Sequence, residues 1–279
     1  MSLFLHASDS NSRIANIHLV ASYTGPMVNS TSQELLDNID LRRWLLENAP
    51  GGKTRTGVHL YNQRNNVHTN IRTLGIWFEH GHYPHNPQGN LTYTNCTGFD
   101  IGAQFIQVVS RDPEACDPLG YLNVGTHAVI GCTAEKCGQP RGYGRASFAL
   151  SFFGHQLGGG TTPRGPWGCP VLIKDTRIRH VAEGYELRGA LLCEWRPKLE
   201  VYGGETYYDG TSDRDLHHIH MTDEVIYDGH SFHGQRPVDI DGATKIDFTN
   251  CTGSVCVPRA VSARPVAIAP IIGPTAWTT

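Results

Sequence analysis

The chain has 279 residues, a formal net charge of −3 at pH 7 and a charged fraction of only 18%. This length suits one large domain with a substantial core. The scattered basic residues form no patch of the kind that binds nucleic acid, and no apolar run is long enough for a membrane helix. We therefore expect neither nucleic acid nor a membrane as a partner.

The N-terminal segment MSLFLHASDS lacks both a basic start and a long apolar stretch, so we expect no secretory signal and a cytosolic protein. The eight cysteines are then expected to be free thiols, and the four Asn-x-Ser/Thr sequons to be unglycosylated. Residues 1–13 are predicted to form an extended arm that a neighbouring copy holds in place.

The first elements predicted are a strand and a helix. Residues 14–23 alternate apolar and polar side chains, as a half-buried strand does, and Gly25-Pro26 ends the strand. Thr31 and Glu34 form a capping-box pair, and the apolar residues after them predict a helix over residues 32–48.

Strand patterns then recur to the end of the domain. They cover Val58–Tyr61, Ile71–Glu79, Ile101–Val109, Tyr121–Ile130, Arg145–Phe153, Val171–Ile178, Leu199–Tyr202 and Glu224–Tyr227. Leu187–Arg196 fits either a short helix or a strand, and Pro197 ends it in both cases.

Many short strands separated by turn residues predict a mainly β fold, namely a β-sandwich of the jelly-roll kind over residues 14–256 with the helix 32–48 on its flank. Residues 257–279 place four prolines among valine, isoleucine and alanine, which predicts an extended C-terminal arm. No linker divides the domain.

The densest group of potential metal ligands lies at residues 217–233. His218, His220 and Glu224 have the spacing H-x-H-x-x-x-E, which resembles the first metal-binding motif of the cupin barrels. A second histidine cluster at residues 79–85 could join it around a metal. The alternative is a solvated or interfacial histidine cluster whose charge follows pH. Few residues follow Glu224, too few for the rest of a cupin barrel, so we expect no metal site.

Two short sequences occur twice. TNCTG stands at Thr94–Gly98 and Thr249–Gly253, and C-T-x-x-x-C at Cys132–Cys137 and Cys251–Cys256. Four such thiolates could bind zinc, although structural zinc sites usually have shorter spacings, and buried free thiols are the simpler interpretation. The glycine-rich residues 157–170 lack the Gly-Lys-Ser/Thr ending of a P-loop. With no catalytic motif found, we predict a structural protein without catalytic residues, cofactor or metal.

Three segments, Asn16–Glu47, Gly142–Gly154 and Gly189–Tyr202, resemble in their order and separation the cypovirus polyhedrins, which crystallise inside infected insect cells and embed virus particles. The resemblance implies a β-sandwich with flanking helices and homotrimers packed into a lattice, with residues 1–13 at the position of the segment that clamps trimers together. It further implies occlusion bodies in the host cytoplasm that contain virus particles.

The resemblance also implies that these bodies dissolve at alkaline pH, where tyrosines ionise. Two alternatives stay open. One is a cupin-like metal-dependent enzyme that uses His218, His220 and Glu224. The other is a viral capsid protein, a class that usually carries a basic arm, and this chain has none.

Overall fold

The structure is a computed structural model. It describes residues 3–5, 11–21, 28–30, 36–43, 45–48, 57–61, 63–77, 79–110, 124–138, 147–154, 168–180, 189–208, 216–234 and 238–253. Every regular element within these ranges is a β-strand, and the strands form three parallel sheets, here called A, B and C.

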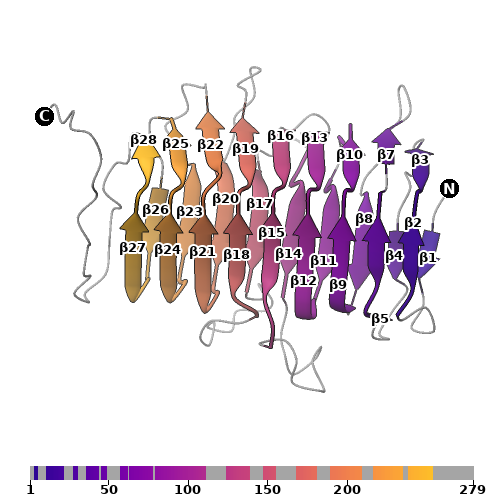
Figure 1. The fold of residues 1–279 in the computed structure, drawn as a ribbon, viewed down its shortest axis with the longest axis horizontal. Coiled ribbons are helices and arrows are strands. Elements are labelled where there is room, and N and C mark those ends of the chain that lie inside the picture. Colours follow the sequence, from indigo (N-terminus) through magenta and orange to yellow (C-terminus); the bar gives the residue numbers. More distant parts are fainter. Residues whose placement is uncertain are drawn as a thin grey trace, which may run out of the picture.

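The strands of each sheet follow one another along the molecule (Figure 1). Sheet A contains β1 (Leu3–Leu5), β4 (Val28–Ser30), β8 (Val58–Tyr61), β11 (His82–His85), β14 (Ile106–Val109), β17 (Phe148–Phe153), β20 (Gly189–Glu194), β23 (His217–His220) and β26 (Val238–Asp241). Sheet B contains β2 (Arg13–Ala15), β6 (Asp40–Arg42), β9 (Gln63–Thr69), β12 (Gln88–Thr94), β15 (His127–Ile130), β18 (Val171–Lys174), β21 (Lys198–Tyr202), β24 (Glu224–Asp228) and β27 (Lys245–Thr249), with β5 (Leu36–Asp37) beside β9. Sheet C contains β3 (His18–Ala21), β7 (Leu45–Asn48), β10 (Arg72–Leu74), β13 (Thr97–Ile101), β16 (Thr133–Cys137), β19 (Arg177–His180), β22 (Glu205–Tyr208), β25 (Ser231–His233) and β28 (Thr252–Gly253).

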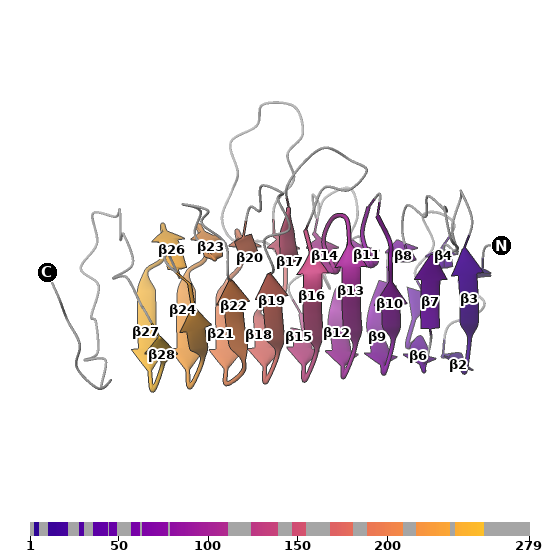
Figure 2. The ribbon, with the colours of Figure 1, turned by 90° about the horizontal axis from the view of Figure 1, so that it is seen from above.

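The chain passes from sheet A to B to C and then returns to A, so each turn of the chain adds one strand to every sheet. Each strand therefore pairs in parallel with the strand one coil later, as β9 does with β12 and β12 with β15. This arrangement is a parallel β-helix, in which coils stack along one axis (Figure 2).

The core fills the inside of this coil. Because side chains alternate along a strand and the strands are in register, residues at one position stack on their counterparts in the next coil. One such row in sheet B is Leu41, His68, Tyr93, Val129, Ile173, Val201, Tyr227 and Phe248. All eight side chains are buried. Most of the buried residues are apolar, and some histidines and tyrosines lie among them.

The corner between sheets B and C has two residues in every coil that the structure describes. The first residue has a positive φ, and these residues are Asn16, Arg43, Asn70, Asn95, Gly131, Asp175, Gly203, Gly229 and Asn250. Asparagine and glycine adopt this left-handed conformation most readily, which explains their frequency here. Backbone N–H groups at the corner bond to the next coil, as Asn70 N does to Thr94 O at 2.9 Å.

The predicted β-sandwich with a flanking helix is wrong. A sandwich of the predicted kind is built from antiparallel strands, whereas every strand pair here is parallel. Short strands with turn residues between them are common to both folds, so that pattern did not distinguish them.

The helix predicted over residues 32–48 is also wrong wherever the structure describes it, because β5, β6 and β7 occupy that region. Ile39 and Leu41 are buried. Asp40 and Arg42, which alternate with them, point outward and form an ion pair. This is the two-residue period of a strand. Residues 31–35, which include the predicted capping box, lie outside the described ranges.

The predicted arms and strands had mixed outcomes. Leu3–Leu5 pairs with β4 as β1, so this described part of the predicted N-terminal arm belongs to a sheet. Residues 257–279 lie outside the described ranges.

Val58–Tyr61 is confirmed with the same limits as β8, and the ambiguous segment Leu187–Arg196 contains the strand β20. Val171–Ile178 is divided by a corner into β18 and β19.

Candidate functional site

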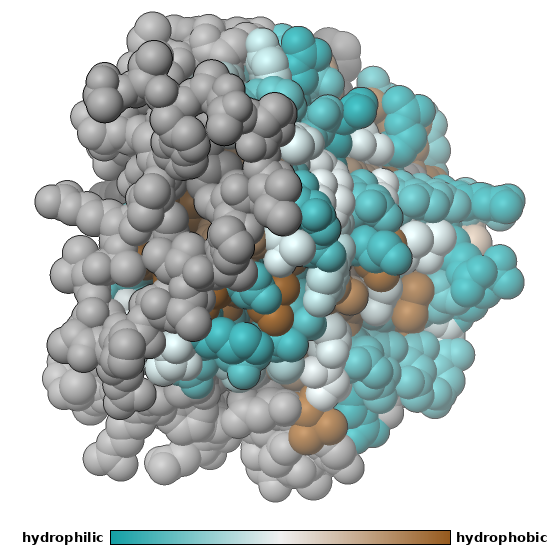
Figure 3. Space-filling view, turned by 60° about the vertical axis from the view of Figure 1, so that its left-hand side comes forward, coloured by the Kyte–Doolittle hydropathy of each residue, from teal (hydrophilic) through white to brown (hydrophobic). Residues whose placement is uncertain are grey.

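The outer faces of sheets B and C carry several ion pairs. On sheet B, Lys198 lies 2.9 Å from Glu200, and Glu224 lies within 4.0 Å of Lys198. On sheet C, Arg177 pairs with Glu205. Exposed ion pairs of this kind contribute little to stability and need no ligand. We regard both faces as ordinary solvent-exposed surface, and the outward residues visible in Figure 3 are mostly hydrophilic.

Sheet A differs because the long connections of the chain all begin or end at its strands. These connections are residues 110–126, 138–147, 154–170, 181–188 and 209–216, while the B-to-C corner has no insertion in any described coil. In coiled repeat proteins, insertions collect on one face, which is often the binding face. The topology therefore directs attention to the outer face of sheet A.

Two histidine–aspartate pairs lie on this face. His218 and His220 point outward from β23, and Asp239 and Asp241 point outward from the neighbouring strand β26. His218 Nδ1 is 3.1 Å from Asp239 Oδ2, and His220 Nδ1 is 3.0 Å from Asp241 Oδ2. When the aspartate accepts a hydrogen bond from Nδ1–H, Nε2 of a neutral ring keeps the lone pair that can accept a proton.

The two imidazoles form one site. Their planes differ by 14° and their centroids are 6.4 Å apart. Glu194 on β20 is the register partner of His220, and Leu192 is that of His218. The ring of Trp195 meets that of His220 edge-on at 6.0 Å. The site thus combines imidazoles and carboxylates with apolar surface.

The middle of the same face carries buried polar atoms without partners. Gln107 on β14 and Ser151 on β17 are register neighbours. Gln107 Oε1 and Ser151 Oγ are buried and have no hydrogen-bond partner in the part of the chain that the structure describes. Such an atom costs about 1–3 kcal/mol when it stays unpaired. A buried polar group of this kind is uncommon in folded proteins.

An aromatic cluster lies at the other end of this face. Tyr83 on β11 stacks on His59 with centroids 4.9 Å apart and packs against His80 at 4.3 Å and His85 at 4.0 Å. Burial lowers the pKa of His59 to about 4 and that of His80 to about 3. These two rings are therefore neutral near pH 7.

A third histidine group lies inside the coil. Thr206 Oγ1 lies 2.8 Å from His217 Nε2 and 3.0 Å from His230 Nε2, and His217 Nδ1 lies 2.8 Å from the Tyr227 hydroxyl. Burial holds the pKa of His217 well below its usual value. These side chains are buried, so we assign them a structural role.

The predicted cupin-like motif is only partly assembled. His218 and His220 do point to one side of one strand, as predicted. Glu224 lies at the start of β24 in sheet B and pairs with Lys198 and Lys245. Within the described residues, no group of three or more histidine, cysteine, aspartate or glutamate side chains could hold a metal. The second histidine cluster lies on and next to β11, four strands from β23 in sheet A.

The repeated cysteine sequences do not form a zinc site among the described residues. Cys132 and Cys251 occupy the same corner position in two different coils. The sheet C strands that follow them, β16 and β28, are four positions apart in the sheet. At about 4.8 Å per strand they cannot bind one ion. Cys256 lies outside the described ranges. The six described cysteines are buried and form no disulfide.

Sequence reasoning missed Asp239, Asp241 and Glu194. A signal was present in Val238–Asp241, where apolar and acidic residues alternate as in a strand with one buried face. Without the neighbouring strand, nothing indicated that the two aspartates lie beside His218 and His220.

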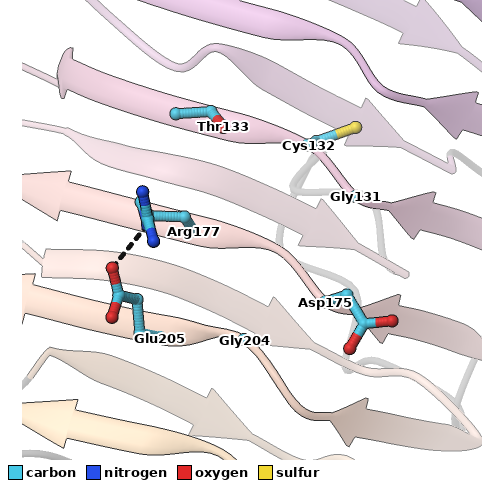
Figure 4. A pocket seen from close by; sticks show the side chains of 7 residues that line it. All are labelled: Gly131, Cys132, Thr133, Asp175, Arg177, Gly204 and Glu205. Carbon is cyan, nitrogen blue, oxygen red and sulfur yellow. Dashed lines mark ion pairs between the residues drawn. The ribbon is translucent and has the colours of Figure 1, made fainter.

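A pocket of about 340 Å³ lies at the B-to-C corner, away from sheet A. It is lined by Gly131, Cys132, Thr133, Asp175, Arg177, Gly204 and Glu205 (Figure 4). The ion pair between Arg177 and Glu205 already neutralises two of its charges, so we assign it no ligand.

Comparison of the chain with protein-family models, with curated proteins and with solved structures gives no match. In the ranges that the structure describes, no helix could cross a membrane. The class of the protein therefore rests on its fold and on the outer face of sheet A.

Proposed function

We propose that this protein binds a polysaccharide along the outer face of sheet A. The observation that carries the proposal is the row of outward residues that crosses the sheet from coil to coil. The row consists of His59, Tyr83, Gln107, Ser151, Leu192, His218 and Asp239. It joins the aromatic cluster, the unpaired polar atoms and one histidine–aspartate pair.

The length of this row favours a polymer as the ligand. Its residues lie on consecutive strands from β8 to β26, about 4.8 Å apart, so the row is on the order of 30 Å long. Sugar hydroxyls can pair with the imidazole of His218 and the carboxylate of Asp239, and flat rings such as Tyr83 offer apolar surface to a sugar ring. A small ligand would leave most of the row unused.

The charges on this face favour a neutral polymer. The described carboxylates pointing outward are Glu194, Asp239 and Asp241, and no lysine or arginine is found among the outward residues described on these strands. An acidic polysaccharide would meet like charge near β23 and β26 without a cation to offset it. Neutral glycans meet no such repulsion.

The test is binding to soluble xylan, galactomannan and hydroxyethyl cellulose, with polygalacturonate as the acidic comparison, measured by affinity electrophoresis. We expect at least one neutral polymer to retard the protein. Tyr83→Ala removes an aromatic ring of the row, so it should weaken binding at least tenfold while circular dichroism still shows a folded protein at the assay temperature. Tyr207→Ala on the outer face of sheet C is the control and should bind as the wild type does.

Two results would contradict the proposal. One is that none of the neutral polymers binds. The other is that Tyr83→Ala binds as well as the wild type while Tyr207→Ala does not.

Self-assembly into crystalline occlusion bodies stays a separate prediction, which electron microscopy of expressing cells would test. The polyhedrin resemblance implied a β-sandwich with flanking helices, and that fold is wrong for this chain. The resemblance therefore no longer supports this function, and no described feature replaces it.

A further inference from the structure

We infer that the two histidine–aspartate pairs hydrolyse the glycosidic bond of the bound polysaccharide. This inference rests on the proposed function, because it needs the polymer to lie across β23 and β26. It goes further by assigning a reaction to a site whose residues so far have only a binding role.

The geometry provides an acid and a base on the same side of one strand. Asp239 and Asp241 each hold the Nδ1 atom of one histidine at 3.1 and 3.0 Å, which leaves both Nε2 atoms for a substrate. The ring centroids are 6.4 Å apart. The carboxyl groups of inverting glycosidases are roughly 6.5–9.5 Å apart, which leaves room for a water molecule, and the spacing of the two rings is just short of that range.

The neighbours of the rings distinguish their roles. His220 lies between the carboxylates of Asp241 and its register partner Glu194, and we assign it as the acid. His218 has a carboxylate on one side only, Asp239, with Leu192 as its partner on the other side and the Phe148 ring 6.4 Å away. We assign His218 as the base.

The reaction then balances without another reactant. His218 Nε2 takes a proton from water as the water oxygen bonds to the anomeric carbon. The bond from that carbon to the bridging oxygen breaks, its electron pair stays on the oxygen, and His220 Nε2–H gives that oxygen a proton. Proton exchange with solvent restores both rings, so one water is consumed for each bond cleaved.

A covalent route through serine is not supported. Ser151 is the described serine in the same row as His218, but Leu192 on β20 lies between them. Two strand steps place their Cα atoms about 10 Å apart, too far for the histidine to activate the hydroxyl. Direct attack by water therefore predicts inversion at the anomeric carbon.

The experiment incubates full-length protein with the neutral polymer that it retards most among xylan, galactomannan and hydroxyethyl cellulose. Reducing ends are measured over time, and the anomer formed first is identified by proton NMR. We expect cleavage with inversion. His218→Gln and His220→Gln should each lower the rate by roughly 10²–10⁴-fold. Because His220 lies outside the binding row, His220→Gln should also bind within threefold of wild type. His233→Gln, an exposed histidine on sheet C, is the matched control and should cleave at the wild-type rate.

Asp241→Asn is a second variant that keeps both histidines and should lower the rate at least tenfold with an unchanged melting temperature. Binding without any cleavage by the wild type would refute hydrolysis and leave the binding function standing. Retention of configuration, or wild-type rates in His218→Gln and His220→Gln, would refute the assigned roles. Failure of all three polymers to bind would refute the binding function itself.

Discussion

Arg196 is fully buried and ties together the ends of two long connections. Its Nη2 donates to Phe153 O at 2.8 Å, and its Nη1 donates to Cys169 O at 3.2 Å and lies 3.2 Å from His127 Nδ1. Phe153 precedes the connection 154–170, Cys169 closes it, and His127 follows the connection 110–126. Burial lowers the pKa of Arg196 to about 10, so it stays charged at neutral pH.

Replacing this arginine should destabilise the protein. Arg196→Met keeps much of the side-chain volume but removes the side-chain donors to Cys169 O and Phe153 O. Phe153 O still accepts from Ser110 N at 2.9 Å, so we expect a loss of about 1–3 kcal/mol, mainly from Cys169 O. We expect a clear fall in melting temperature, measured by circular dichroism. Arg179→Met, an exposed arginine on sheet C, is the control and should change stability by less than about 0.5–1 kcal/mol. Equal melting temperatures for the two variants would show that Arg196 does not hold these connections.

His68 is a buried residue whose replacement should instead stabilise the protein. Both its ring nitrogens lack a hydrogen-bond partner in the described structure, and burial lowers its pKa to about 3. Its row neighbours are Leu41 and Tyr93, so leucine suits the position. We expect His68→Leu to raise the melting temperature at pH 7 and more so at pH 5. His233→Leu, at an exposed position, should show neither effect, and a lower melting temperature for His68→Leu would refute the argument.

At the scale of elements, the B-to-C corner can be tested with two glycines. Gly229 has φ 70°, and a Cβ there would meet its nearest atom at an ordinary 3.9 Å. Asn70, Asn95 and Asn250 occupy this corner position in other coils. Gly229→Asn should therefore change stability by less than about 1 kcal/mol, because asparagine tolerates the left-handed conformation.

Gly204, the second residue of its corner, provides the contrast. It has φ 73°, and a Cβ there would lie 2.3 Å from Thr176 O, a backbone atom of the preceding coil. Gly204→Ala should destabilise the protein by several times more than Gly229→Asn, as thermal or urea unfolding would show. Similar losses in both variants would mean that the close approach of coils does not set the requirement for glycine.

The corner also explains what could be predicted from the sequence. Individual strands such as Val58–Tyr61 were predictable because their alternation is local. The fold was not, although TNCTG at Thr94–Gly98 and Thr249–Gly253 marks the same corner in two coils. The first corners, at Asn16, Arg43 and Asn70, are equally spaced along the chain, but the connections 110–126 and 154–170 disturb that spacing later.

In the candidate site, the two histidines could be predicted from the sequence, but their acidic partners could not. His218 and His220 are close in sequence and alternate along one strand, so their common direction follows from local geometry. Their partners Asp239 and Asp241 come from the next coil, and Glu194 from the preceding one. Contacts between coils depend on register, which a sequence without a recognised repeat does not define.

At the scale of the whole molecule, the buried histidines predict sensitivity to acid. Burial lowers the pKa of seven histidines below the usual 6.5, and they are His59, His68, His80, His82, His127, His217 and His230. Between the folded-state pKa and about 6.5, the unfolded chain binds more protons than the folded one. Stability therefore falls as the pH decreases through this window.

The size of the effect follows from linkage. Each such histidine contributes a loss of up to about 1.4 kcal/mol for each pH unit below 6.5, until its folded-state pKa is reached. That pKa is about 4 for His59 and about 3 for His68. We expect cooperative unfolding between about pH 6 and pH 4, followed by circular dichroism, with the transition of His68→Leu displaced to lower pH. A protein that stays folded at pH 3.5 would contradict the burial of these rings.

The constant two-residue corner also makes the length of the molecule adjustable. All variation in connection length lies at sheet A, so a whole coil can be added between two corners while its neighbours keep their register. Each added coil lengthens the outer face of sheet A by about 4.8 Å. The number of coils then sets the length of the outer face that one molecule offers to the proposed polymer.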